Sequence, residues 1–460
     1  MGLPVSMILR YSIKNFLGLD SAVIYYALLR ILQVLGGVVT LLFITWYFTA
    51  ELQGYYYTFA SLIALQTFLE LGLYIVITTY ASHQWSSLDM DENQLVSGDE
   101  TSLGNLGSLV KFVSLWYGIA AILFVLIIGT IGFIFLSNED SLGLSWKVPW
   151  VLHVIFSAVS FWCMPILYIL EGCDQVTKVA KFKSLQVLFA NIVFWLAISS
   201  GIGLWAVPIF SMVIAVSSLF YILFVWGSFF QILMAPRIKT SFNWRRDLFS
   251  MQWRLALQGF VNYFGWAAFT LIIFNYHGPV LAGKMGMSQQ IIMSILSLAM
   301  VWTTTKVPNF GMLISKSNFV ELDRMWFAAA MRSTMVTFFG VLSIYILIVV
   351  AQNLDMAYGR RVLSHDSFLI LAVGTVFSAM VQCIAVYLRS HKKEVLTIPA
   401  VISNLMIGGL AWYLGISYAE FGVACVYLGV TSLLMFPASI VIWKAFRMNR
   451  HAADFIISRQ

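Results

Sequence analysis

The sequence predicts an all-α polytopic membrane protein, with about 12 transmembrane helices in two six-helix lobes around a central cavity. Three observations predict this fold. Hydrophobic residues make up 60% of the chain and charged residues only 10%, which excludes an ordinary soluble domain. The apolar residues form continuous runs of about 20 residues, the length at which a helix crosses ~30 Å of hydrocarbon, and not the alternating short segments of a β-barrel. Finally, the basic residues lie on alternate loops.

Each apolar run is read as one span, with limits that are uncertain by a few residues. The expected spans are residues 22–47, 54–80, 110–136, 148–170, 181–201, 204–230, 255–275, 284–305, 327–350, 366–388, 395–415 and 419–443.

The basic residues also predict the orientation of the chain. With the N-terminus in the cytoplasm, 22 of the 27 Lys and Arg residues lie on the cytoplasmic side. The exceptions are Arg30, deep in the first span, and four residues outside, Lys147, Lys284, Arg360 and Arg361. This bias is the positive-inside rule, so we expect a multi-pass protein of the bacterial inner membrane with both termini cytoplasmic. The net charge of +7 then reflects orientation and contact with anionic lipids, and no nucleic-acid partner is expected.

The predicted loops divide the chain near its midpoint. The basic loop around 231–254 separates six spans from six, which predicts an N-terminal lobe of residues 1–235 and a C-terminal lobe of residues 236–460. A glycine near the start of the second span, Gly54, and one at the start of the eighth, Gly283, indicate a weak internal repeat.

Two cytoplasmic segments differ from the basic loops. Residues 81–109 carry five acidic residues with Ser and Gly between them, which favours a flexible acidic loop. Residues 7–19 are expected to form a short amphipathic helix at the membrane interface.

Polar residues inside the spans are the candidate functional residues. A charge in the hydrocarbon costs several kcal/mol, so such residues usually face a bundle interior or a water-filled cavity. Helical spacing of three or four residues places the members of each cluster on one face. We predict that three clusters line a hydrophilic cavity between the lobes: Arg30 with Gln33, Gln66 with Glu70, and Arg254 with Gln258 and Asn262.

In this interpretation the cations hold an anionic headgroup such as pyrophosphate. Glu70 either pairs with Arg30 or takes part in proton or cation coupling. The structural alternative is that Arg30 and Glu70 form a buried pair, while Arg254 only marks a helix end. Lone amides in other spans are expected to join helices by hydrogen bonds, and they are Asn191, Gln382 and Asn404. A sugar-stacking role for an inner aromatic such as Trp266 is a further alternative.

Motifs for enzymatic chemistry are missing from the sequence. No HExxH, P-loop or GxSxG pattern occurs, and the six histidines are scattered over both predicted faces. We therefore expect no catalytic residues, no metal site and no cofactor, and we do not expect an enzyme.

One stretch resembles a known family. In residues 50–85, Gln53-Gly54-Tyr55-Tyr56 is followed by Leu69-Glu70-Leu71-Gly72-Leu73. These elements resemble the opening of O-antigen and oligosaccharide flippases of polysaccharide biosynthesis, within the multidrug/oligosaccharidyl-lipid/polysaccharide exporter superfamily. Residues 278–291 and 302–315 look like the opening of that family's second half.

The resemblance implies alternating access by two rocking lobes. The implied cargo is an oligosaccharide on undecaprenyl pyrophosphate, which the protein moves from the cytoplasmic to the outer leaflet for surface polysaccharide biosynthesis. Expected partners are this lipid-linked oligosaccharide and membrane lipids, and a polysaccharide polymerase or another assembly protein is a further candidate.

Three alternatives stay open. A multidrug cation antiporter of the same superfamily would prefer acidic cavity residues, whereas Glu70 is the only carboxylate clearly inside a span. A polysaccharide polymerase or ligase would need larger external loops than this chain has. A scaffold of a glycan assembly complex would use the basic cytoplasmic loops as its contact surface.

Overall fold

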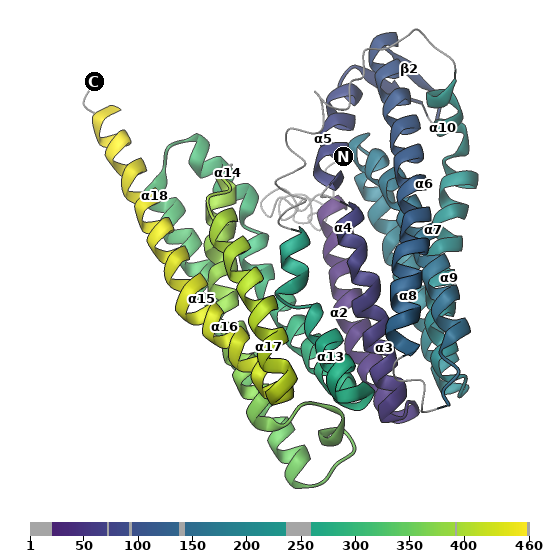
Figure 1. Cartoon of the computed structure of the whole chain (residues 1–460). Helices are drawn as coiled ribbons and strands as arrows, with labels where there is room; N and C mark the ends of the chain where they lie inside the picture. Colours follow the sequence, from purple (N-terminus) through teal and green to yellow (C-terminus); the bar gives the residue numbers. More distant parts are fainter. Residues whose placement is uncertain are drawn as a thin grey trace, which may run out of the picture. The chain divides into compact units, whose positions relative to one another are not determined.

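The protein is almost entirely helical (Figure 1). In the part of the chain that the structure describes, nine helical stretches are long and apolar enough to cross a membrane, which confirms the all-α polytopic class. The segment 7–19, Arg254 and Gln258 lie outside the described residues. The computed structural model describes residues 21–70, 73–91, 94–137, 143–235, 259–391 and 393–457.

The chain forms two compact units. The first comprises the described residues of Met1–Phe43, Phe68–Ile134 and Leu144–Ala256. The second comprises those of Ile44–Thr67, Phe135–Gly143 and Leu257–Gln460, so it includes two segments from the N-terminal half. The lobes of residues 1–235 and 236–460 stay a prediction.

Within the first unit, α7 packs against α5 and α9, and α8 packs against α9. Large aromatic side chains such as Trp150 and Phe161 fill its core. Its elements are α2 (Ser21–Tyr47, which reaches the second unit), α5 (Leu73–Trp85), β1 (Leu88–Met90), β2 (Val96–Gly98), α6 (Glu100–Ser137), α7 (Lys147–Gly172), α8 (Val176–Ser199), η3 (Gly203–Trp205), α9 (Ala206–Phe220), η4 (Tyr221–Val225) and α10 (Gly227–Met234).

Within the second unit, α13 packs against α3, α15 and α17, and α16 packs against α15, α17 and α18. Its elements are α3 (Ala50–Ile63), η1 (Ala64–Gln66), α4 (Thr67–Glu70, at the unit boundary), α13 (Ala268–Thr304), α14 (Val307–Ser315), α15 (Phe319–Asn353), η5 (Gly359–Arg361), α16 (His365–Ser390), α17 (Thr397–Val430), η6 (Thr431–Met435) and α18 (Phe436–Ile457).

Two of these helices contain a chain reversal. In α13 the backbone of Gly278 has φ 81 and ψ 176, and Pro279, which lacks an N–H group, begins the helix that follows. In α17 the reversal lies at Ala419, with φ 50 and ψ −137. Both fall where the sequence predicts short turns between two spans.

The surface of the helices is apolar. Exposed fractions reach 75% for Phe224, 78% for Val320 and 80% for Leu433. A soluble protein rarely leaves so many large apolar side chains in water, whereas lipid tails accommodate them. The exposed apolar surface therefore agrees with the composition in placing the helices in a bilayer.

Two local expectations were wrong. The second predicted span, 54–80, is not one helix: α3 ends at Ile63, a 3-10 turn and the short α4 follow, and α5 begins at Leu73. The segment 81–109 is not a flexible loop, because Leu88–Met90 and Val96–Gly98 pair as an antiparallel hairpin. The Asp99 carboxylate accepts the Ser102 N–H at 2.8 Å and so caps the start of α6, which lies ten residues before the expected span at 110.

Each half of the predicted topology ends in a helix with a π-helical segment. These segments are η4 in the sixth predicted span and η6 in the twelfth. Because π-helical turns occur often at functional sites, their surroundings are relevant to the search for a site.

Candidate functional site

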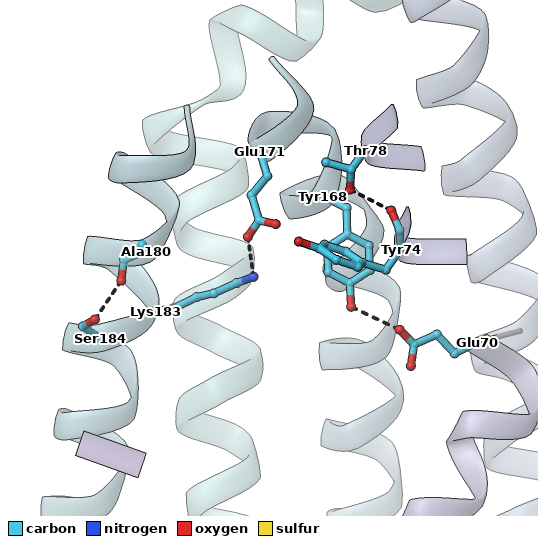
Figure 2. A network of polar contacts seen from close by, with 8 residues as sticks. All are labelled: Glu70, Tyr74, Thr78, Tyr168, Glu171, Ala180, Lys183 and Ser184. Carbon is cyan, nitrogen blue, oxygen red and sulfur yellow. Dashed lines mark hydrogen bonds and ion pairs between the residues drawn. The ribbon is translucent and has the colours of Figure 1, made fainter. Parts of the chain in front are cut away.

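Glu70 belongs to a cluster of tyrosines in the first unit (Figure 2). The hydroxyl of Tyr168 on α7 donates to Glu70 Oε1 at 3.3 Å. The ring of Tyr74 on α5 packs edge-on against that of Tyr168, with 4.7 Å between centroids. The hydroxyl of Thr78 donates to the Tyr74 carbonyl at 2.7 Å. The Glu70 carboxylate is thus held by a neutral hydroxyl within the bundle.

A second carboxylate lies near the same tyrosine, and it is Glu171 at the end of α7 (Figure 2). Lys183 Nζ on α8 contacts Glu171 Oε1 at 2.7 Å, and the exposed fractions of the two side chains are 24% and 3%. The same ammonium lies 5.6 Å from the centroid of the Tyr168 ring. Because Glu171 and Lys183 flank the turn between α7 and α8, the helical hairpin brings them together.

The sequence did not single out this ion pair. Glu171 lies one residue beyond the expected span 148–170, and Lys183 lies near the start of the expected span 181–201. An acid at the end of one helix and a base about two turns into the next, joined by a short turn, are the signal that identifies it.

The residues predicted on the first span lie on α2. Arg30 and Gln33 are exposed, and an N–H of Arg30 donates to Gln33 Oε1 at 3.4 Å. Glu70 instead contacts Tyr168, and no ion pair joins Arg30 to Glu70 in the described chain. Gln66 ends the 3-10 turn η1 and is half-buried. The proposed Arg30–Glu70 pair is therefore not formed.

The second unit contains a polar cavity of about 500 Å³. It lies among the helical residues 259–264, α13, α16, α17 and η6. Of the predicted site residues, Asn262 lines it. Its other polar side chains within the bundle are neutral amides and hydroxyls, and they are Thr304, Ser378, Gln382, Ser403, Asn404, Tyr427 and Thr431.

Asn262 and Asn404 form one wall of this cavity. Asn404 Nδ2 donates to Asn262 Oδ1 at 3.0 Å, which joins α17 to the helix before α13, as expected for a lone amide. This contact requires a glycine at position 265, because a Cβ there would lie 2.0 Å from Asn404 Oδ1. The buried hydroxyl of Ser403 beside them has no hydrogen-bond partner in the described part of the chain, so it can serve a ligand.

Irregular backbone borders the cavity on two sides. The helix that contains Asn262 breaks at a turn over residues 265–267, before α13 begins. Gln289 spans this break, because its Nε2 donates to the Trp266 carbonyl at 2.8 Å and its Oε1 accepts from the Thr270 hydroxyl at 2.8 Å. On another side the π-helix η6 contributes Thr431 and Met435 to the lining. Broken helices beside a polar cavity are typical of transporter binding sites.

The charged residues of the cavity gather where α16 leads into α17. They are Arg389, Lys393 and Glu394, and we call them the mouth cluster. Arg389 Nε lies 3.7 Å from Glu394 Oε1, so the single carboxylate of the lining is already paired. The cluster therefore has a net positive charge and favours an anionic group.

The fold was compared with known proteins. No family model matches the sequence, and no curated protein matches it. Solved structures do match its fold. A multidrug resistance MATE family transporter of the MOP superfamily, in an inward-facing conformation, has 15% identity and a TM-score of 0.60, covering 97% of this chain and 98% of that chain.

Two further structures give the same result. A MATE transporter of Vibrio cholerae has 11% identity and a TM-score of 0.58, covering 93% of this chain and 96% of that chain. The lipid II flippase MurJ, in an inward closed conformation, has 15% identity and a TM-score of 0.57, covering 95% and 92%. The chain therefore has the fold of MOP superfamily membrane transporters.

Proposed function

We propose that this protein is a flippase for oligosaccharides linked to undecaprenyl pyrophosphate. It moves them by alternating access from the cytoplasmic to the outer leaflet of the bacterial inner membrane, for surface polysaccharide biosynthesis such as that of O-antigen. The observation that carries the proposal is the cavity of the second unit, which combines a neutral hydrogen-bonding interior with a positively charged mouth cluster.

The interior of the cavity suits a glycan. Sugar hydroxyls cannot enter hydrocarbon unaided, because each unsatisfied polar group costs several kcal/mol. The amides of Asn262 and Asn404 and the free hydroxyl of Ser403 replace the lost water. Trp266 packs against Tyr427 with 5.1 Å between ring centroids, and its face offers a stacking surface for a sugar ring.

The mouth cluster suits the phosphate groups of the carrier lipid. Arg389 and Lys393 are exposed at the predicted cytoplasmic end of the cavity. In this arrangement the polyprenyl chain stays in the bilayer, the pyrophosphate is held by the two cations, and the glycan reaches the amide wall. A multidrug cation antiporter would need unpaired carboxylates here, and Glu394 is paired with Arg389.

The sequence has no P-loop for nucleotide hydrolysis. Energy for the movement must therefore come from an ion or potential gradient, or from removal of the product on the outer side. We propose that Glu70, held by the hydroxyl of Tyr168, is the coupling group for protons or another cation. Arg30, Gln33 and Gln66 are proposed to contribute to the cargo pathway, and so are Arg254 and Gln258, which lie outside the described residues.

The proposal is tested in cells that lack this chain, by mass spectrometry of lipid-linked glycans and an assay of the leaflet that holds them. Accumulation on the cytoplasmic leaflet is the expected result. Complementation with a double variant, Arg389→Gln with Lys393→Gln, should restore little flipping. The matched control is Lys316→Gln with Arg324→Gln, which removes two exposed cations that do not line the cavity.

Other outcomes separate the alternatives. Glycans that reach the outer leaflet but stay unpolymerised indicate a polymerase or ligase. An unchanged pool together with increased drug accumulation indicates a multidrug antiporter, and an unchanged pool alone indicates a scaffold.

A further inference from the structure

A second cavity lies in the second unit, apart from the one described above. Its volume is about 300 Å³, and it lies where η5 meets α13, α15 and α17. Lys284 and Arg360 both line it, although they are far apart in the sequence. They are two of the four basic residues that the charge pattern places outside the cytoplasm. Basic residues outside the cytoplasm run against the positive-inside rule. Because two of them line one cavity, we expect their charge to have a role at that cavity.

The segment that carries Arg360 is fixed by four hydrogen bonds, of which one is buried, two are half-buried and one is exposed. Gln352 Nε2 donates to the carbonyls of Gly359 at 3.2 Å and Leu363 at 2.8 Å, and its Oε1 accepts the His365 N–H at 3.1 Å. The Leu363 N–H donates to the buried Ser288 hydroxyl of α13 at 3.0 Å. The backbone around Arg360 is therefore positioned before any ligand arrives.

Donors for an anion remain available at both cations. Arg360 donates through Nε to Asp355 Oδ1 at 2.7 Å and through one terminal nitrogen to Oδ2, which leaves its other N–H groups for a ligand. The hydrogen bond from Arg360 lowers the pKa of Asp355, so this pair is charged at neutral pH. Lys284 is half-buried and makes no ion pair with any described residue.

An acceptor faces the same cavity. Glu420, just after the reversal at Ala419, lines it and also makes no ion pair in the described part of the chain. Together with Asp355, Glu420 balances the charge of Lys284 and Arg360. A site that is neutral overall but offers separate cationic and anionic groups fits a ligand with both a phosphate and a hydrogen-bond donor better than a bare anion.

We propose that this cavity binds the headgroup of an outer-leaflet lipid through its phosphate. Lys284 and Arg360 contact the phosphate oxygens, and Glu420 accepts from an ammonium or hydroxyl group of the head. A phospholipid and the carrier lipid of the cargo both supply a lipid-borne phosphate. The assignment of the site to the outer leaflet depends on the predicted orientation of the chain. Lipid binding itself does not depend on the proposed function.

Native mass spectrometry of the full chain in detergent tests the proposal, with phosphatidylethanolamine as the probe. Lys284→Gln should weaken binding about fivefold, which corresponds to about 1 kcal/mol for one cation near a lipid phosphate. The matched control is Lys147→Gln, because Lys147 is also predicted outside but lies in the first unit beside the ring of Trp146. Equal binding by the wild type and both variants would overturn the proposal.

The headgroup and the source of the phosphate are tested separately. Glu420→Gln should reduce the preference for phosphatidylethanolamine over phosphatidylcholine, whose quaternary ammonium donates no hydrogen bond. Competition by undecaprenyl pyrophosphate assigns the site to the carrier lipid as well, and its failure assigns the site to phospholipid alone. Full displacement by inorganic phosphate at matched concentration would contradict a headgroup site. If lipid binding persists in a protein that moves no glycan, only the flippase proposal fails.

Discussion

Gly54 and Gly283 lie against each other where α3 packs on α13. A Cβ added at Gly283 would lie 2.8 Å from the backbone nitrogen of Gly54, and one added at Gly54 would lie 2.0 Å from the carbonyl oxygen of Pro279. Gln53 crosses the same contact, with Nε2 donating to the Gly283 carbonyl at 2.9 Å. Close approach of the two backbones therefore depends on the absence of side chains.

Substitution of Gly54 by Ala should destabilise the second unit. The added methyl group meets backbone atoms that cannot rotate away, so the helices must separate, at a cost of about 1–3 kcal/mol. Thermal unfolding in detergent measures the change. Gly409→Ala on α17 is the control, because a Cβ there meets nothing within 4 Å. Equal melting temperatures for the two variants would contradict tight packing at Gly54.

The sequence predicted the fold class well because span length and charge bias are properties of single segments. It predicted the turns near Gly278 and Ala419 for the same reason, whereas their position on the outer side stays a prediction. It did not predict the break after Ile63, because the hydropathy of residues 54–80 is that of a single span, and the polar Gln66 and Glu70 within it do not mark a 3-10 turn. It did not predict the pairing of Leu88–Met90 with Val96–Gly98, because strands of three residues are too short to show an alternating pattern in an acidic segment.

The candidate sites were harder to predict, because their contacts join distant segments. Helical spacing selected Glu70, but it could not identify Tyr168, which lies 98 residues away, as its partner. Asn262 was predicted to line a cavity between the lobes and Asn404 to join helices. One hydrogen bond joins the two amides in the wall of a cavity within the second unit, and the cavity between the lobes stays a prediction. Ser403 offered no signal, because a serine in an apolar run is usually a packing residue.

The Glu171–Lys183 pair predicts an asymmetric response to substitution. Lys183→Met leaves a carboxylate with an exposed fraction of 3% without its cation, whereas Glu171→Gln leaves an ammonium with an exposed fraction of 24% that can turn toward water. Loss of one partner of a buried pair costs about 3–5 kcal/mol, so Lys183→Met should approach this range and Glu171→Gln should fall below it.

The double variant, Glu171→Gln with Lys183→Met, completes the cycle for this pair. It should be more stable than Lys183→Met alone, because no uncompensated charge stays buried. Unfolding midpoints of the four proteins give the coupling free energy. Additive changes would show that the two side chains do not interact in the membrane.

The Asp323 carboxylate anchors α18 to α15 and α16. It accepts from Arg447 Nε at 2.6 Å and from the Tyr387 hydroxyl at 2.8 Å. Asp323→Ala should therefore loosen α18 and increase its cleavage by protease, by more than Tyr387→Phe, which removes one of the two contacts. Because the Arg447 side chain has an exposed fraction of 43%, we expect a modest loss of about 1–2 kcal/mol. Equal cleavage rates in wild type and Asp323→Ala would exclude this anchor.

The amide wall of the larger cavity should matter more for transport than for stability. Asn404→Leu removes one interhelical hydrogen bond, which in membranes contributes about 0.6 kcal/mol on average. Gln186→Leu is the matched control, since Gln186 donates to the Ile214 carbonyl and to two serine hydroxyls but does not line the cavity. Flipping per folded molecule should fall in Asn404→Leu and stay near wild type in Gln186→Leu, although Gln186→Leu should lose more stability. If Asn404 had only a structural role, the variant that loses more stability, Gln186→Leu, would also lose more flipping. Lower flipping in Gln186→Leu than in Asn404→Leu would therefore contradict a role of Asn404 in transport.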